Sequence, residues 1–120
     1  MFGLIFDILL LLFLKHLIVD FFLQTDAMIQ QKGQYGQPLG ILHSFLHGVG
    51  TSTVFVHWMD WETAVWLGVI DMILHYHIDW LKMRFKYPIT DRRFWWAFGI
   101  DQFLHQFTYI VLVFWFFAFY

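Results

Sequence analysis

The sequence predicts an all-α, polytopic membrane protein that folds as a four-transmembrane-helix bundle. Three observations support this fold class: the chain has only 120 residues, 60% of them are hydrophobic, and only 13% are charged. A soluble domain contains roughly a quarter charged residues, and a chain of this length normally forms one domain. We therefore expect a single domain over residues 1–120, embedded in a lipid bilayer.

Four apolar stretches are long enough to cross the hydrocarbon core, which requires about 20 residues of helix. They cover residues 2–23, 39–58, 63–82 and 95–118. The first connection is polar and ends at Gly36 and Pro38, which interrupt helices, and the third contains Pro88. The link near Asp60 is very short, so the second and third helices should form an antiparallel hairpin.

The basic residues predict how the helices are oriented. All seven lie in or beside the first and third connections, and none lies at a terminus or in the short second link. The positive-inside rule then places these two connections in the cytoplasm and both termini outside it. The basic residues are Lys15, Lys32, Lys82, Arg84, Lys86, Arg92 and Arg93.

Polar residues spaced four apart recur within the predicted helices. Residues at i and i+4 share one helix face, so each pair directs two side chains the same way. Ionisable residues inside a membrane are costly and usually functional. The four pairs are His16 and Asp20, His43 and His47, His75 and Asp79, and Asp101 and His105.

The helix directions place all four pairs in the cytoplasmic half of the bundle, in two tiers about 6 Å apart. The deeper tier contains four imidazoles, and the shallower tier contains three carboxylates and one imidazole. The pairs also repeat, because the first and third are offset by 59 residues and the second and fourth by 58. Two repeated helical hairpins related by a pseudo-two-fold axis would produce this spacing.

These residue types favour a metal site. Imidazole and carboxylate ligands suit Zn, Fe or Mn, and helical bundles build metal sites from inward-facing side chains. We expect the eight paired residues to bind a divalent metal, with zinc favoured. They could hold two metals, or one metal and the groups that orient its ligands. Independent contacts between helices would explain any one pair, but not four pairs at one depth.

Three further polar residues are candidates for substrate binding. Gln24 continues the face of His16 and Asp20, while Lys32 and Lys82 lie at the cytoplasmic rim and could hold an anion. An anionic lipid or lipid-linked phosphate would suit this position beside the bilayer. The chain has no basic surface pattern of the kind that binds nucleic acid, since its net charge is −2. Its 16 Phe residues suit a lipid environment better than a surface that stacks on bases. A homodimer is compatible with the small volume that four short helices enclose.

Four ordered segments resemble a family of short bacterial and phage membrane proteins of unknown function. The segments are HLIVDFFLQTDAMIQQK from residue 16, HSFLH from residue 43, HYHIDWLK from residue 75 and DQFLH from residue 101. The resemblance covers nearly the whole chain and implies the bacterial inner membrane, crossed several times. It also implies a shared core of His16, Asp20, Gln24, Lys32, His43, His47, His75, Asp79, Lys82, Asp101, Gln102 and His105. The chain is more loosely similar to membrane-bound metal-dependent hydrolases.

The leading hypothesis is a metal-dependent hydrolase that acts at the cytoplasmic side on an anionic, lipid-like or phosphate-containing substrate. The candidate catalytic residues are Asp20, Asp79, Asp101 and Lys82. A metal-ion or proton transport protein is the main alternative, because Asp and His chains also form ion pathways. A di-iron redox enzyme and a regulator with a structural metal are further alternatives, although Glu62 is the only Glu available for a di-iron site. The sequence leaves open the metal, the substrate and whether the protein is an enzyme.

Overall fold

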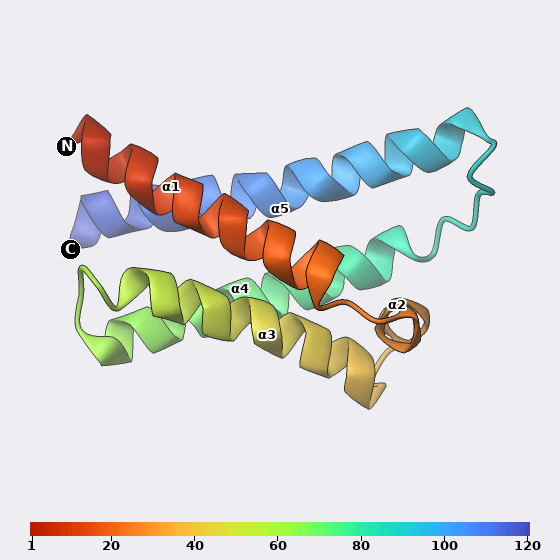
Figure 1. Cartoon of the computed structure of the whole chain (residues 1–120), viewed down its shortest axis with the longest axis horizontal. Coiled ribbons are helices and arrows are strands. Elements are labelled where there is room, and N and C mark those ends of the chain that lie inside the picture. The colour runs from red at the N-terminus through yellow and green to blue at the C-terminus, as the bar shows by residue number, and fades with distance from the viewer.

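The computed structural model describes all 120 residues as helices joined by short connections, with no β-strand. Four long helices run alternately in opposite directions, and a short helix lies at one end (Figure 1). The elements are α1 (Phe2–Leu17), the π-helical turn η1 (Ile18–Phe22), α2 (Asp26–Lys32), α3 (Pro38–Phe55), α4 (Trp61–Lys82) and α5 (Arg92–Phe119). The all-α class and the four expected helices are confirmed, whereas α2 and η1 were not expected from the sequence.

Local signals set where the helices begin. At the start of α4, the side chain of Asp60 accepts a hydrogen bond from the backbone N–H of Thr63 at 2.9 Å, which caps the helix. Before α3, Gly36 has a φ of 84°, a conformation that favours glycine. The chain then enters α3 at Pro38, the first helical position, where proline is well tolerated.

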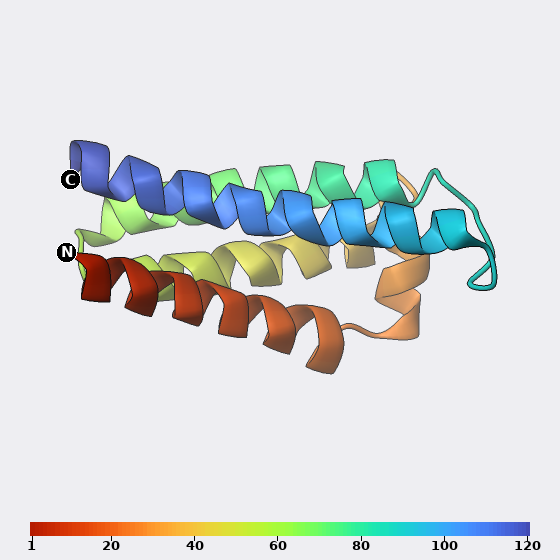
Figure 2. The same ribbon diagram turned by 90° about the horizontal axis from the view of Figure 1, so that it is seen from above.

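The four long helices form an antiparallel bundle in which α1 and α4 are diagonal to each other. Each of these two helices packs against both α3 and α5, as the view from above also indicates (Figure 2). At the contact of α3 with α4, a Cβ atom added to Gly48 would lie only 2.7 Å from the carbonyl oxygen of Gly68. Small residues therefore allow these two backbones to approach closely.

The interior changes character along the bundle axis. Both termini and the α3–α4 turn lie at one end, while α2 and residues 83–91 lie at the other (Figures 1 and 2). The half beside the termini contains the apolar core, and the other half contains polar side chains. Of the 30 buried residues, 14 are polar or charged and 13 are hydrophobic. The apolar core consists of Ile8, Leu12, Val54, Phe55, Met59, Ala64, Leu67, Tyr109, Leu112, Val113 and Phe116.

The outer surface is strongly apolar. Large hydrophobic side chains are exposed on every long helix, including Phe6, Phe45, Ile73 and Phe103. Two helical segments, Phe2–Phe22 and Arg92–Phe119, are long and apolar enough to cross a membrane. Four membrane spans were expected, so length and composition support two of them.

Candidate metal centre

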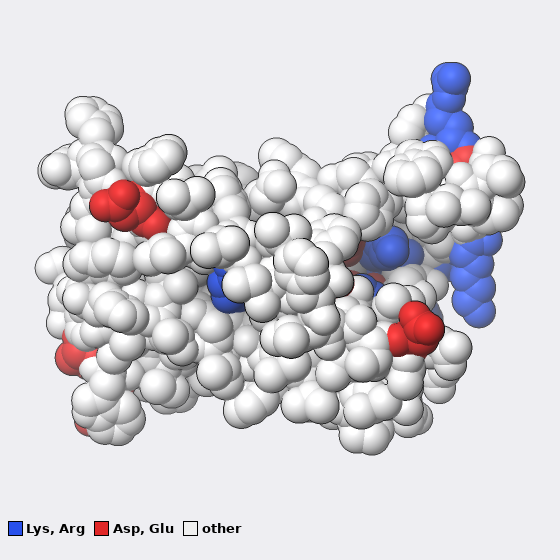
Figure 3. All heavy atoms as spheres, in the orientation of Figure 1, with Lys and Arg blue, Asp and Glu red and all other residues white.

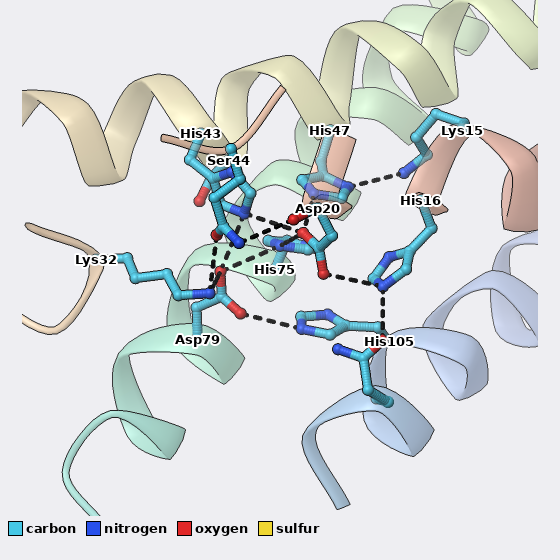
Figure 4. A network of polar contacts seen from close by, with 12 residues as sticks. Lys15, His16, Asp20, Lys32, His43, Ser44, His47, His75, Asp79 and His105 are labelled. Carbon is cyan, nitrogen blue, oxygen red and sulfur yellow. Dashed lines mark hydrogen bonds and ion pairs between the residues drawn. The ribbon is translucent and has the colours of Figure 1, made fainter. Parts of the chain in front are cut away.

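The eight paired His and Asp residues lie together in the interior, where they form what we call the His/Asp cluster. Figure 4 labels all of them except Asp101. They come from α1, η1, α3, α4 and α5. Every one of them is buried, and the most exposed, Asp20, retains only 8% of its accessible surface. The tertiary structure thus brings all eight candidate ligands into one site. The His/Asp cluster consists of His16, Asp20, His43, His47, His75, Asp79, Asp101 and His105.

Asp20 connects two sides of the cluster. It lies in η1, where the end of α1 widens into a π-helical turn, a feature that is frequent at functional sites. Its Oδ2 atom lies 3.0 Å from Nε2 of His16 on α1. Its Oδ1 atom faces α3 and lies 2.8 Å from Nε2 of His47. The two oxygens of one carboxylate therefore face ligands from different helices.

Four donor atoms converge beside Asp20. One atom from each of Asp20, His43, His47 and His75 lies within 4.8 Å of all the others. Oδ1 of Asp20 is 3.1, 2.8 and 3.8 Å from the Nε2 atoms of the three histidines in that order. Donors bound to tetrahedral zinc at about 2.0–2.1 Å lie about 3.3 Å from one another. These separations are therefore compatible with a single metal ion held between the four side chains.

A second set of donors surrounds Asp79. Nε2 of His75 lies 3.2 Å from Oδ2 of Asp79, and Nε2 of His105 lies 3.1 Å from Oδ1. Asp101 Oδ1 lies 3.4 Å from the same nitrogen of His105. His75 belongs to both sets, and one Nε2 lone pair binds only one ion. The two sets therefore cannot both use His75 Nε2 at the same time.

Two buried ring nitrogens in the cluster, Nδ1 of His43 and Nδ1 of His75, have no polar partner. The Nε2 atoms of the same two histidines, Oδ2 of Asp79 and Oδ1 of Asp101 lie 3.1–3.4 Å from a partner of the cluster without forming an aligned hydrogen bond. Leaving a buried polar group unpaired costs about 1–3 kcal/mol, so such groups are rare in native proteins. A metal ion would use imidazole lone pairs and carboxylate oxygens of this kind. The residues present thus fit a divalent cation.

The contacts repeat between the two hairpins, as the sequence offset predicts. Asp20 and Asp79 lie 3.0 and 3.2 Å, respectively, from the histidine four residues earlier. They lie 2.8 and 3.1 Å from the deeper histidine of the next long helix. The repeat breaks where His43 in the first hairpin corresponds to Asp101 in the second. This difference gives the first donor set its third imidazole.

Lys15 is buried beside the cluster, near the end of α1, so it does not form part of the basic cytoplasmic surface for which it was counted. Its Nζ atom donates to Oδ2 of Asp71 at 2.8 Å and to the hydroxyl oxygen of Tyr109 at 3.1 Å. The hydroxyl of Thr51 donates to the same Asp71 oxygen at 2.5 Å. These four residues form a second polar layer, which we call the Lys15 layer, between the cluster and the apolar core.

The pattern that located the cluster extends into the Lys15 layer. Thr51 follows His47 by four residues, Asp71 precedes His75 by four, and Tyr109 follows His105 by four. Each therefore continues the inward face of its helix. Tyr109 also contacts the cluster directly, since its hydroxyl lies 2.8 Å from Nδ1 of His16. One further step of the same spacing along each helix would have located all three residues from the sequence.

Two candidate substrate residues cover the cluster. Lys32 on α2 is buried, and its Nζ atom donates to Oε1 of Gln24 at 3.0 Å and lies 3.5 Å from Oδ2 of Asp79. Gln24 in turn donates to the backbone carbonyl of Asp20 at 2.9 Å. Charged atoms are visible in a hollow bounded by the end of α1, α2 and α5 (Figure 3). Lys32 and Gln24 thus close the cluster from the side of α2.

Lys82 lies apart from the buried network. Its Nζ atom has no carboxylate partner and lies 5.9 and 5.6 Å from the ring centres of Phe94 and Phe98 on α5. Gln102 is closer to the cluster, because its Oε1 atom lies 3.0 Å from Nε2 of His16. Lys82 is therefore the candidate whose positive charge is least engaged within the chain.

A bundle of four long helices around buried His and Asp residues defines an all-α protein with a candidate metal centre. Residues 8–119 match the family described as "Protein of unknown function (DUF3307)", and the chain belongs to this family. This match agrees with the expected membership of an uncharacterised family. No curated protein and no solved structure matches the sequence.

Proposed function

We propose that this protein is a metal-dependent hydrolase of the bacterial inner membrane, with its site in the cytoplasmic half of the bundle. The observation that carries the proposal is the convergence of Asp20, His43, His47 and His75, all buried, within 4.8 Å. The Nδ1 atoms of His43 and His75 support it, because both are buried and neither has a hydrogen-bond partner in the chain.

The distribution of polarity supports a position within the membrane. The exterior of the helices is apolar and half of the interior is polar, which is the reverse of a soluble domain. The long axis measures 43 Å, and a bilayer with its headgroups is about 40–45 Å thick. Exposed Trp residues lie near both ends, as interfacial residues do, at Trp61 and Trp66 and at Trp95 and Trp96. We therefore propose four spans rather than two.

The remaining exposed basic residues support the orientation. Lys15 and Lys32 are buried and cannot count toward it. The other five lie at the end that carries residues 83–91, where Lys and Arg atoms gather on the surface (Figure 3). This end faces the cytoplasm under the positive-inside rule, and both termini lie outside. The five residues are Lys82, Arg84, Lys86, Arg92 and Arg93.

The cluster contains the groups that a hydrolytic site requires. A zinc ion bound by Asp20, His43, His47 and His75 would lower the pKa of a bound water molecule and polarise the bond under attack. Asp79 and Asp101 lie beside this set and can accept a proton. Lys32 and Lys82 provide the positive charge for an anionic substrate. Iron and manganese are the other metals that this donor set suits.

Transport remains the second candidate because the Lys15 layer extends the polar interior beyond the cluster. A complete path would also need polar groups in the half beside the termini. That half is filled by the apolar core, where Ile8, Leu12 and Phe55 are fully buried. The apolar core in that half argues against a continuous polar channel through the bundle.

Metal analysis of the detergent-purified protein tests the proposal. We expect about one zinc per native chain and little in His43→Ala, since this change removes one donor from the four-donor set. His57→Ala is the matched control, because His57 is exposed, lies beyond the end of α3 and hydrogen-bonds only to the backbone carbonyls of Thr53 and Val54. Absence of bound metal from native protein that has been offered zinc, iron and manganese would overturn the metal centre.

Reporter fusions test the membrane arrangement separately. A periplasmic reporter fused after Tyr120 should be active, and the same reporter placed after Lys86 should be inactive. Metal-driven flux into sealed vesicles, together with no hydrolysis of phosphate esters, would favour the transport alternative. The reverse pair of results would favour the hydrolase.

A further inference from the structure

A groove separates the C-terminal part of α4 from the N-terminal part of α5. Residues 83–91 connect the two helices at the end of the bundle beside α2 (Figure 1). The groove has a volume of about 290 Å³, and eight of the eleven residues that line it are hydrophobic. The residues used below are Ile78, Lys82, Arg93, Ala97, Ile100 and Asp101.

Two basic side chains line the groove, Lys82 and Arg93. The acidic residue Asp91 lies two positions before Arg93. Asp91 pairs with Arg93 at 2.8 Å, and the hydrogen bonds from Arg93 hold the pKa of this carboxyl below its usual value. Lys82 has no such partner and lies against two aromatic rings of α5. The groove therefore offers one cation that is not neutralised by an acidic neighbour.

The inner end of the groove reaches the His/Asp cluster. Asp101 lines the groove and also contacts His105 within the cluster. Its Oδ1 atom is buried without a hydrogen-bond partner. Lys82 follows Asp79 by three residues, which is about 4.5 Å along the helix axis. A group bound at Lys82 would therefore lie beside the cluster, on its outer side.

A second hollow provides a comparison. It lies between α3 and α4, has a volume of about 360 Å³ and is lined by Gly48, Ser52 and Gly68 among others. No charged residue lines it. A lipid chain could lie in either place, but only the groove between α4 and α5 can distinguish a charged headgroup from a neutral one.

We propose that the groove between α4 and α5 binds a single-chain lipid that carries a terminal phosphate. The chain lies along Ile78 and Ile100, and the phosphate contacts Lys82 beside Asp101. The role of this lipid as a substrate rests on the proposed function, because the lipid would be the substrate class of the hydrolase. The binding itself does not require a metal, because Lys82 and the apolar lining belong to the chain alone.

Native mass spectrometry of the EDTA-treated full chain in detergent tests the groove. The probes are lysophosphatidic acid, lysophosphatidylcholine with the same acyl chain, and inorganic phosphate. We expect the native protein to bind the first probe about tenfold more tightly than the second, as expected for one additional charged hydrogen bond. Inorganic phosphate alone should not compete, because the chain supplies most of the apolar contact.

Two variants and their controls locate the binding. Lys82→Gln should abolish the tenfold preference, whereas Arg84→Gln, which changes a cation outside the groove, should preserve it. Ala97→Trp should weaken binding of both lipids by filling the groove, whereas Phe103→Trp, at an exposed position of α5, should not. Unchanged binding in both Lys82→Gln and Ala97→Trp would overturn the proposal.

The metal experiment and the lipid experiment fail independently. A protein that binds zinc but shows no preference for lysophosphatidic acid contradicts only the groove. A protein that shows the preference in EDTA but never binds zinc contradicts only the metal centre. Equal binding of the two lipids by the native chain identifies a general lipid contact and also overturns the headgroup assignment.

Discussion

The two halves of this bundle are built from the same four helices but have opposite interiors, one apolar and the other polar. Beside the termini, Leu12, Phe55 and Leu112 form an apolar core that excludes polar groups. Beside α2, the same helices direct His and Asp side chains into a buried cluster with unpartnered donor atoms. The first half can hold the helices together by packing, whereas the second half needs a counter-charge or a ligand. The apolar core and the candidate metal centre thus occupy different halves of one bundle.

The Lys15 layer lies at the boundary of the two halves. It contains the buried ion pair whose disruption should destabilise the protein most. Lys15 is the only cation that contacts Asp71, and both side chains are buried. Gly50 makes room for it, because a Cβ atom at that position would overlap Cγ of Lys15. The layer therefore lets an apolar core adjoin a polar site without leaving an isolated buried charge.

The largest expected loss of stability comes from a substitution that removes the ion pair between Lys15 and Asp71. Lys15→Met leaves Asp71 buried and unpaired, which should lower the free energy of unfolding by about 3–5 kcal/mol. Adding Asp71→Leu should restore much of the loss, because the double variant contains neither charge. Unfolding in mixed micelles measures both variants. Equal stability of the single and double variants would show that the ion pair does not matter.

One substitution in each half, with a smaller expected effect, tests whether the apolar core and the His/Asp cluster are independent. Leu12→Ala removes a fully buried side chain from the apolar core and should cost about 3 kcal/mol. It should leave zinc stoichiometry unchanged in the protein that remains folded. His43→Ala should do the reverse: zinc is lost and the metal-free protein changes little in stability. If both variants lose zinc and stability together, the two halves are not independent.

Adding a methyl group at the close contact between α3 and α4 should lower the free energy of unfolding by about 1–3 kcal/mol, the usual cost of overpacking. Gly68→Ala would place a Cβ atom against Ser52 Oγ and the carbonyl oxygen of Gly48, so the melting temperature should fall. Gly99→Ala is the matched control on α5, because nothing lies within 4 Å of its added Cβ. That control should be neutral or slightly stabilising, since alanine favours helix.

The smallest effect concerns the cap of α4 at the apolar end. The hydrogen bonds from Thr63 hold the pKa of the exposed Asp60 carboxyl below its usual value of 3.8. A carboxyl with a lowered pKa contributes stability above its unfolded pKa, and this contribution is lost as the pH falls through the folded value. Asp60→Asn keeps a capping oxygen and should flatten the loss of stability as the pH falls from about 5 through the usual pKa of 3.8 and below it. Melting curves across that range measure the change; identical curves for both proteins would contradict it.

The sequence predicted the helices and the cluster because both depend on local periodicity. Apolar stretches of about 20 residues specified four helices, and i, i+4 spacing put each pair on one face. The offset of 58–59 residues anticipated the matching distances around Asp20 and Asp79. Each of these inferences needs only the position of a residue along a helix.

The depth of Lys15 and Lys32 was not predictable in the same way. A lysine near a helix end normally extends toward water and marks topology. Here Asp71 and Gln24, which are 56 and 8 residues away in sequence, hold the two ammonium groups inside. The π-helical turn that contains Asp20 could not be predicted from the sequence either. Apart from Asp20, its residues are as apolar as those of the helix before it.

The sequence by itself determined which faces of the helices are polar, since that follows from chain periodicity alone. Only the tertiary structure decided which polar residues meet. It placed Asp20 between His16 and His47, paired Lys15 with Asp71, and opened a groove that leads to Asp101. The physical reason is that contacts between helices depend on how four rigid faces are rotated against each other. That rotation is set by packing over the whole bundle and not by any one segment.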